Sequence, residues 1–431
     1  MAESKLTSAL KAALDDPKSA GDRIREVPRE AVSTREETEL VVQLLRQFPL
    51  SSDSSAKRAI GSALHSVAAL FQRADGKEVT ALLREQGCPE LLRIFDVEMR
   101  KAPPEKKSQN DLLFLLKIVC MYGAKGGLER VVSAARSAQL KDGYLWSIIF
   151  DIVSKDRHPW RADIIEALRE PLPDGFVVVT FLDLCNAAAR SGGLSRHPFD
   201  TEAGIALLRG WLRETDEDDS SYARSAAASI PFLSPGSRAE VQALADEHRD
   251  RGVQLEAAWA AAACGDERGY QKLETACLDP REASAAIHYL TELGAENRIP
   301  SHARTEDFEA ISEMCQWLAH PSEFGHPPQE IHQVEARELF CPPTDDRRKL
   351  WVFRYKYPPR EGKTEPQVGY GMVGSVTFAL FGESTADLSA KQVYGLHCAW
   401  ELECKGDSRA PKKRSPEAGI QILKEHNPDF G

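Results

Sequence analysis

The feature of the sequence that most constrains its fold is an internal repeat in the first three-quarters of the chain. The segment DGYLWSIIFDIV, which opens at Asp142, aligns with DGFVVVTFLDLC, which opens at Asp174, and Tyr144 then matches Phe176. A third apolar segment, DLLFLLKIVCMYG, opens at Asp111, so the three openings are almost evenly spaced. Since aspartate is a preferred N-cap residue, we predict three helices that begin near these aspartates.

A second series of similar segments follows, and its members open at Asp219, Asp250 and Asp279. The acidic run ETDEDDSS (214–221) is interpreted as the loop in which Asp219 caps the first of these helices. Each member carries an Ala-Ala pair, at 226–227, 257–258 and 285–286. Small side chains let neighbouring helices approach closely, and one helix pair cannot bury its apolar stripe alone. The pattern therefore predicts stacked antiparallel helix pairs.

These repeats resemble the HEAT-repeat family, in its shorter form of about 30 residues per repeat. The residues that carry the resemblance are Asp250, Val253, Ala257–Ala258 and Gly265–Asp266, and the resemblance covers roughly positions 105–295. The family often has an arginine after the apolar position, whereas this chain has glutamine there. The resemblance implies an α-solenoid with an open groove. The alternative is an irregular helical domain without regular stacking.

After residue 320 the helical repeats give way to a segment rich in proline and glycine and then to sequence typical of strands. We therefore predict a helical-repeat domain over 1–320 and a small α+β domain over 321–431. Two segments, 349–357 and 372–381, are rich in β-branched and aromatic residues and are predicted to pair as antiparallel strands. A helix is predicted over 390–402. The predicted fold class is thus mainly α, with a small antiparallel sheet near the C-terminus.

Capping residues predict where two helices of this second domain begin. Ser389 and Gln392 form an S-x-x-Q capping box before the helix over 390–402. A last helix is predicted to start at Pro416, with Ser415 as its N-cap.

One face of the first predicted strand is aromatic. Alternation places Trp351, Phe353, Tyr355 and Tyr357 together if the segment is extended. Trp351 and Tyr355 are therefore a candidate interaction face, and the alternative is that they only seal the sheet against the last repeat. Tryptophans 146, 259 and 400 lie in apolar helical stripes and are predicted to be core residues.

The stretch GYGMVGSV (369–376) matches G-x-G-x-x-G-x-V, the glycine loop that covers ATP in protein kinases. Too little chain follows for the other kinase motifs: no H-R-D catalytic loop occurs after it, so the D-F-G at 429–431 lacks the loop that precedes it in kinases. A dinucleotide loop needs a helix directly after the last glycine, whereas SVTFALF favours a strand. We therefore predict a tight connection or bulge and assign no cofactor-binding residue.

Two further groups of residues are candidates for chemical sites. Cys315, His320, His326, His332 and Cys341 are possible zinc ligands, but their spacing matches no closed structural zinc pattern. His397 and Cys398 are adjacent on a helix and point about 100° apart, so they cannot form a nucleophile–base pair with each other. No catalytic or metal-ligating residue is assigned.

Charge and cysteine usage limit the classes of partner. The net charge is −11, and the predicted repeat domain over 1–320 holds 40 basic and 50 acidic side chains. This balance makes nucleic acid an unlikely partner, although a local basic face is compatible with it. Nine unpaired cysteines and the lack of a secretory signal or long apolar run predict a cytoplasmic protein without membrane contact.

The predicted function is a non-catalytic protein-interaction scaffold that binds an unidentified protein partner in the groove, on the second helices of successive pairs. The alternative is a repeat-based enzyme or lyase with its site in the groove or at the junction with the second domain. Two enzyme classes built from such repeats are disfavoured, since the chain has no His-Glu dipeptide and no overall basic charge. Bilin lyases also use short repeats of this kind and stay open as an alternative.

Overall fold

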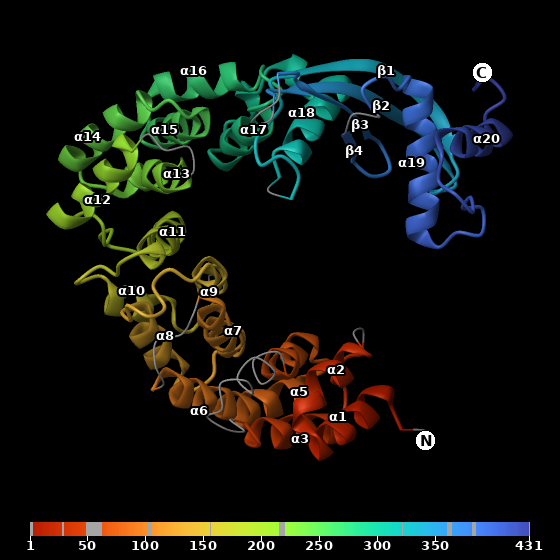
Figure 1. Cartoon of the computed structure of the whole chain (residues 1–431). Helices are drawn as coiled ribbons and strands as arrows, with labels where there is room; N and C mark the ends of the chain where they lie inside the picture. The colour runs from red at the N-terminus through yellow and green to blue at the C-terminus, as the bar shows by residue number, and fades with distance from the viewer. Residues whose placement is uncertain are drawn as a thin grey trace. The chain divides into compact units, whose positions relative to one another are not determined.

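The computed structural model describes residues 3–27, 30–48, 63–100, 106–155, 157–214, 220–320, 322–359, 364–381 and 385–430 (Figure 1). These residues form two compact units, Met1–His248 and Arg249–Gly431. The chain is mainly helical with one four-stranded antiparallel sheet near the C-terminus, which confirms the predicted fold class at this level. The predicted domain boundary after residue 320 stays a prediction. The change from helices to strands lies inside the second unit.

The first unit is built from helices that follow one another closely along the chain. They are α1 (Lys5–Asp15), α2 (Ala20–Arg25), α3 (Arg35–Arg46), α5 (Lys77–Leu82), α6 (Cys88–Met99), α7 (Lys106–Tyr122), α8 (Gly127–Ala135), α9 (Leu145–Ser154), α10 (Arg161–Leu168), α11 (Phe176–Arg190), α12 (Glu202–Arg213), α13 (Ser220–Ser229) and α14 (Pro235–Asp246). Residues 63–69 are also helical.

Alternate helices in the middle of this unit pack against one another in chain order. Helices α7, α9, α11 and α13 form one such series, while α8 packs on α10 and α12 on α14 (Figure 1). Aromatic rings fill the space between α9 and α11, where Phe150 lies 6.2 Å from Phe181 between ring centroids. Trp146 is fully buried and donates from its indole nitrogen to the carbonyl oxygen of Leu140 at 2.7 Å. Its predicted core role is confirmed.

The helices near Asp142 and Asp174 exist, but neither aspartate caps its helix. Helix α11 begins after Gly175, whose φ of 65° suits a residue without a side chain. The first-turn N–H of Val177 donates to the carbonyl oxygen of Lys141 at 3.1 Å, so a neighbouring loop satisfies it. Helix α9 begins at Leu145, so Tyr144 and not Asp142 occupies the N-cap position, and no side chain caps the helix. The predicted N-cap roles of these two aspartates are wrong for these reasons.

Of the other aspartates predicted as N-caps, one is confirmed. Asp250 caps α15 (Arg251–Ala263), where its Oδ1 accepts from the N–H of Val253 at 3.0 Å. Asp111 lies inside α7, because that helix begins earlier than predicted. Asp279 bonds the backbone two residues on and lies before the turn that leads into α17 (Ala283–Glu292). Asp219 lies outside the described residues.

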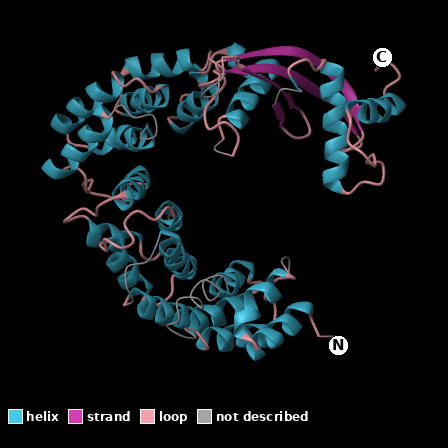
Figure 2. Ribbon diagram, viewed as in Figure 1, coloured by secondary structure: helices cyan, strands magenta, loops and turns pink. Residues whose placement is uncertain are grey.

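The second unit places further helices beside a sheet. After α15 and α17, already defined, the remaining helices are α16 (Glu267–Ala276), α18 (Glu306–Leu318), α19 (Ala390–Lys405) and α20 (Pro416–His426). The strands are β1 (Glu330–Cys341), β2 (Asp346–Tyr357), β3 (Gln367–Val373) and β4 (Phe378–Phe381). They pair antiparallel in the order β1-β2-β3-β4 (Figure 2). Strand β2 confirms the predicted strand over 349–357.

The two faces of the sheet are covered by different helices. On one face, the buried rings of Phe353, Tyr355 and Tyr357 pack with Met314 and Leu318 of α18. This confirms that the aromatic residues of β2 share a face. The other face packs against α19 and α20 through a second set of buried residues: Leu339, Leu350, Val352, Tyr370, Met372, Val393, Leu402 and Leu423. The sheet is therefore the middle layer of three.

The predicted strand over 372–381 is two strands instead of one. Strand β3 ends at Val373, the chain reverses, and β4 pairs back on β3 with Met372 opposite Phe378. The glycines of this hairpin allow close packing, since a Cβ on Gly371 would overlap Met314. GYGMVGSV is thus a strand that leads into a hairpin turn. It differs from the strand-to-helix loop that binds dinucleotides.

The predicted starts of α19 and α20 are confirmed. Ser389 and Gln392 form the capping box of α19, and Ser415 Oγ accepts from the N–H of Ala418 at 3.2 Å at the start of α20. The two helices cross at glycines, because Gly419 of α20 lies against the backbone of α19. This contact brings the two helix backbones together.

Candidate functional site

The five residues considered as zinc ligands do not converge on one point. Cys315 is buried in α18, and burial raises the pKa of its thiol to about 12. Cys341 is buried at the end of β1, and burial likewise raises its pKa. His320, His326 and His332 are exposed. Within the described part of the chain, no group of three or more His, Cys, Asp or Glu side chains could hold a metal ion.

The two residues of the candidate interaction face differ in accessibility. Tyr355 is 1% exposed, and its hydroxyl donates to the carbonyl oxygen of Leu380 at 2.9 Å. Trp351 is half-buried, and its indole N–H donates to Asp307 of α18 at 2.7 Å. Lys349 lies over the Trp351 ring, 5.0 Å from its centroid. The Trp351 contact attaches β2 to α18 and the Tyr355 contact attaches β2 to β4, so a partner could reach only Trp351. A partner contact on this face stays a prediction.

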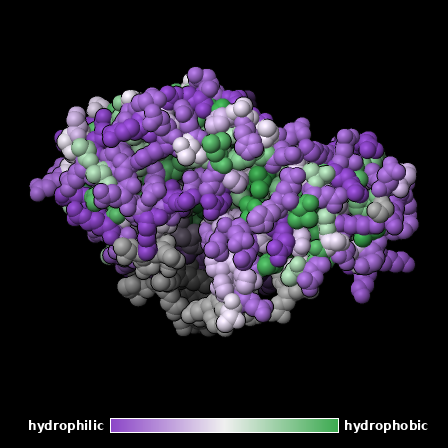
Figure 3. All heavy atoms as spheres, turned by 90° about the horizontal axis from the view of Figure 1, so that it is seen from above, coloured by the Kyte–Doolittle hydropathy of each residue, from purple (hydrophilic) through white to green (hydrophobic). Residues whose placement is uncertain are grey.

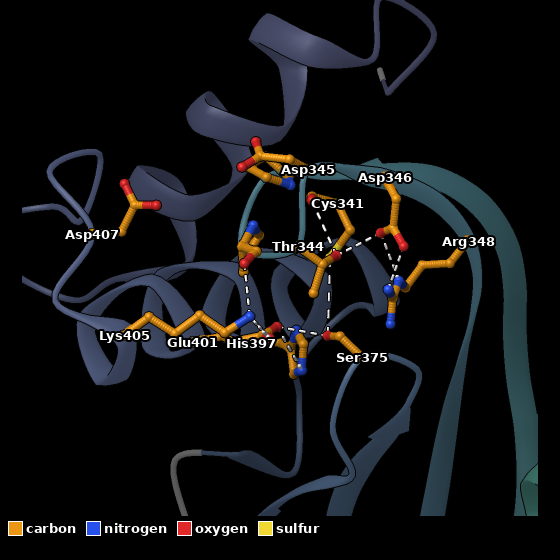
Figure 4. Close-up of polar contacts among 12 residues, drawn as sticks. Cys341, Thr344, Asp345, Asp346, Arg348, Ser375, His397, Glu401, Lys405 and Asp407 are labelled. Atoms are coloured by element: carbon orange, nitrogen blue, oxygen red, sulfur yellow. Dashed lines mark hydrogen bonds and ion pairs between the residues drawn. The ribbon is translucent and has the colours of Figure 1, made fainter.

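A buried polar network joins α19 to the hairpin turns of the sheet (Figure 4). At its centre, Glu401 is 2% exposed and its Oε2 accepts from Ser375 Oγ at 2.6 Å. The ammonium of Lys405 lies 2.8 Å from Glu401 Oε1 and also donates to the carbonyl oxygen of Pro343. His397 Nε2 lies 3.9 Å from Glu401 Oε2. The β1–β2 turn, the β3–β4 turn and α19 are held together in this way.

The groups in this network are not arranged as an activated nucleophile. Ser375 donates its hydroxyl proton to Glu401 and not to a histidine. Burial lowers the pKa of His397 to about 4, against the opposing charge of Glu401. The thiol of Cys341 lies 3.9 Å from Ser375 Oγ and stays protonated, because burial raises its pKa. The base that activates a serine must be free to take its proton, whereas Glu401 is also paired with Lys405 at 2.8 Å. The network therefore fits a structural role.

A second buried histidine links three segments of the first unit. His197 is 2% exposed, and its Nε2 lies 3.2 Å from Oδ1 of Asn186 on α11. The amide of Asn186 donates to the carbonyl oxygen of Ser225 on α13 at 3.0 Å. His197 Nδ1 accepts from the N–H of Phe199. The imidazole is thus neutral, and burial lowers its pKa to about 4.

We expect these two histidines to make folding stability depend on pH between about 6.5 and 4. His197 and His397 stay neutral in the folded chain down to a pKa of about 4, whereas the unfolded chain binds their protons from about 6.5. Their contribution is therefore complete above about pH 6.5 and is lost as the pH falls toward 4. Thermal melts measure this effect, and the melting temperature of His197→Gln should change less over this pH range than the melting temperature of wild type. Identical dependence would contradict this assignment.

Four aromatic side chains of the first unit line an open pocket of about 560 Å³. Three of them belong to helices, Phe176 at the start of α11, Trp211 in α12 and Tyr222 in α13, and Tyr144 directly precedes α9. The Tyr222 ring lies 6.4 Å from Phe176 and 5.7 Å from Trp211 between centroids. The remaining lining residues are Asp142, Gly175, Val178 and Leu207. We call this cavity the aromatic pocket.

The aromatic rings of this pocket are accessible to solvent. Tyr144 is 60% exposed, and Phe176, Trp211 and Tyr222 are half-buried. Large apolar surface that stays exposed on a folded chain is characteristic of binding sites. The aromatic pocket is therefore the candidate functional site.

Asp142 is the only charged residue among the eight described residues that line the aromatic pocket. Because it does not cap α9, its carboxylate is free of that helix, and its Oδ1 lies against Gly175. A Cβ at position 175 would meet this oxygen, so glycine leaves room for it. The pocket thus combines aromatic faces with one carboxylate.

The pocket was not predicted as a site, although the sequence pattern relates two of its four aromatic residues to each other. Tyr144 and Phe176 occupy matching positions of the repeat, directly after an Asp-Gly pair. An aromatic residue repeated at the exposed start of successive helices would have indicated a common surface. Trp211 and Tyr222 carry no such signal, because they belong to segments outside that alignment.

Comparisons of the chain with models of protein families, with curated proteins and with solved structures give no match. Among the described residues, no helix is long and apolar enough to cross a membrane. Figure 3 shows one face of the molecule, on which hydrophilic residues predominate and hydrophobic ones form scattered groups.

Proposed function

We propose that this protein is a non-catalytic interaction protein that binds a segment of a protein partner in the aromatic pocket. The observation that carries the proposal is the set of four solvent-accessible rings around one cavity. Tyrosine and tryptophan are enriched among residues that dominate binding energy, and pockets of this volume accommodate ligand side chains. Among the described residues, Asp142 is the single charged group that lines the site.

We also propose that the helices form a HEAT-like stack of the short-repeat kind. The ordered packing of α7, α9, α11 and α13 supports this arrangement. Stacking would bring the starts of successive helices to one surface, which is where Tyr144, Phe176 and Tyr222 lie. The partner would then bind at the starts of the first helices of each pair and at α12, in place of a groove on the second helices alone.

Partner capture with purified variants tests the interaction proposal. We expect Trp211→Ala and Tyr144→Ala each to weaken capture of the partner by about ten-fold or more, as truncation of a central aromatic residue does in protein interfaces. Trp317→Ala is the matched control, because Trp317 of α18 is 42% exposed and lies outside the pocket. Equal capture by wild type and both pocket variants would contradict the proposal.

A further inference from the structure

We propose that the aromatic pocket receives a cationic side chain, an arginine or a lysine, from a peptide segment of the partner. This inference rests on the proposed function and specifies the chemistry of the occupant. It is drawn from the described residues that line the pocket, which comprise four aromatic rings, one carboxylate and no basic group.

The carboxylate of Asp142 is available to a ligand. Within the described part of the chain, its side chain takes part in no hydrogen bond or ion pair, and the residue is exposed. By contrast Asp151, further along α9, is paired with Lys155 at 2.9 Å. A cation about 4 Å from a carboxylate is attracted several times more strongly near a protein surface than in bulk water. A bound cation would find its counter-ion in Asp142.

The rings supply the second attraction. A guanidinium or ammonium group over an aromatic face is attracted by the ring quadrupole, and the attraction is stronger when the cation is desolvated. Tyr222 lies within 6.4 Å of both Phe176 and Trp211, so one cation can contact more than one ring. Val178 and Leu207 offer apolar surface to the methylene groups of an arginine or lysine stem.

The negative charge of the whole chain also favours a cationic ligand. The net charge is −11, and acidic residues outnumber basic ones over positions 1–320. Such a field attracts a basic segment and repels an acidic or phosphorylated one, mainly through the rate of association. The pocket is also larger than one side chain needs, so residues that flank the cation fit beside it.

The probe for the experiment is the peptide acetyl-Gly-Arg-Gly-Arg-Gly-amide, with its citrulline analogue as the neutral isostere. Binding to the full chain is followed by the NMR signal of the Trp211 indole N–H, which is assigned with Trp211→Phe. We expect a saturable shift with the arginine peptide and about ten-fold weaker binding of the citrulline peptide. Asp142→Asn should weaken binding of the arginine peptide to a similar degree. Asp151→Asn is the matched control in the adjoining helix and should bind like wild type.

Equal binding of the two peptides, or an unchanged affinity in Asp142→Asn, would overturn the cationic occupant. That result would leave the proposed function standing if Trp211→Ala still fails to capture the partner. Self-association of the chain that involves the Trp211 signal and is not displaced by the arginine peptide would indicate a second copy as occupant and would also overturn the inference. The peptide experiment therefore tests the cationic occupant, and the capture experiment separately tests the proposed function.

Discussion

Replacing Gly419 with alanine should destabilise the second unit by about 3 kcal/mol or more. A Cβ at this position would overlap the carbonyl oxygen of Gly395, which belongs to the backbone of α19 and cannot rotate away. Helices α19 and α20 would have to separate, and Leu423 would lose part of its contact with the sheet. Overpacking of a closely packed site costs typically about 1–3 kcal/mol, and a backbone overlap belongs at the upper end.

The same substitution at Gly210 is the control for Gly419→Ala. Gly210 lies inside α12 at an exposed position, and a Cβ there would meet no atom within 4 Å. Gly210→Ala should therefore stabilise the chain by about 0.5–1 kcal/mol, because alanine favours the helix. Chemical denaturation of both variants measures the two free energies of unfolding. A neutral effect at Gly419 would show that the two helix backbones are not in contact.

Trp146→Ala should reduce the free energy of unfolding by about 3–5 kcal/mol, the range found for truncating a buried aromatic residue. Trp146 is fully buried, packs on Phe150 at a centroid distance of 5.3 Å, and bonds Leu140 through its indole N–H. The substitution would leave a cavity between α9 and α11 and remove one of the two hydrogen bonds that the carbonyl oxygen of Leu140 accepts.

Tyr144→Ala, two residues earlier, is the matched comparison for Trp146→Ala. Tyr144 is 60% exposed, so its truncation should change the free energy of unfolding by no more than about 0.5 kcal/mol. Denaturation curves of both variants test this contrast. A large loss of stability in Tyr144→Ala would mean that the ring belongs to the core and not to a binding surface.

The fold could be predicted from the sequence wherever local patterns decide it. The capping box of Ser389 and Gln392 and the alternating aromatic residues of β2 specify their elements through neighbouring residues alone. The N-caps were less predictable, because an aspartate caps a helix only if no other acceptor reaches the first-turn amides. At α11 the carbonyl oxygen of Lys141, from a loop much earlier in the chain, accepts from Val177 in place of an aspartate.

The candidate site was less predictable than the fold. Tyr144 and Phe176 were aligned by the repeat, but whether a ring at a helix start is buried or exposed depends on how neighbouring helices pack. Trp211 reaches the pocket only because α12 packs on α13. For Tyr355 the sequence left two roles open, a partner contact and sealing of the sheet, because it does not reveal that α18 covers that face of the sheet.

Site-specific photo-crosslinking tests the central claim, a partner bound in the aromatic pocket, most directly. A benzophenone amino acid placed at position 144 should crosslink the partner in cells, and excess arginine peptide should prevent the crosslink. The same group at position 381, where the native phenylalanine is 53% exposed in the second unit, serves as the control and should give no crosslink to that partner. A partner that crosslinks at position 381 and not at position 144 would contradict the claim.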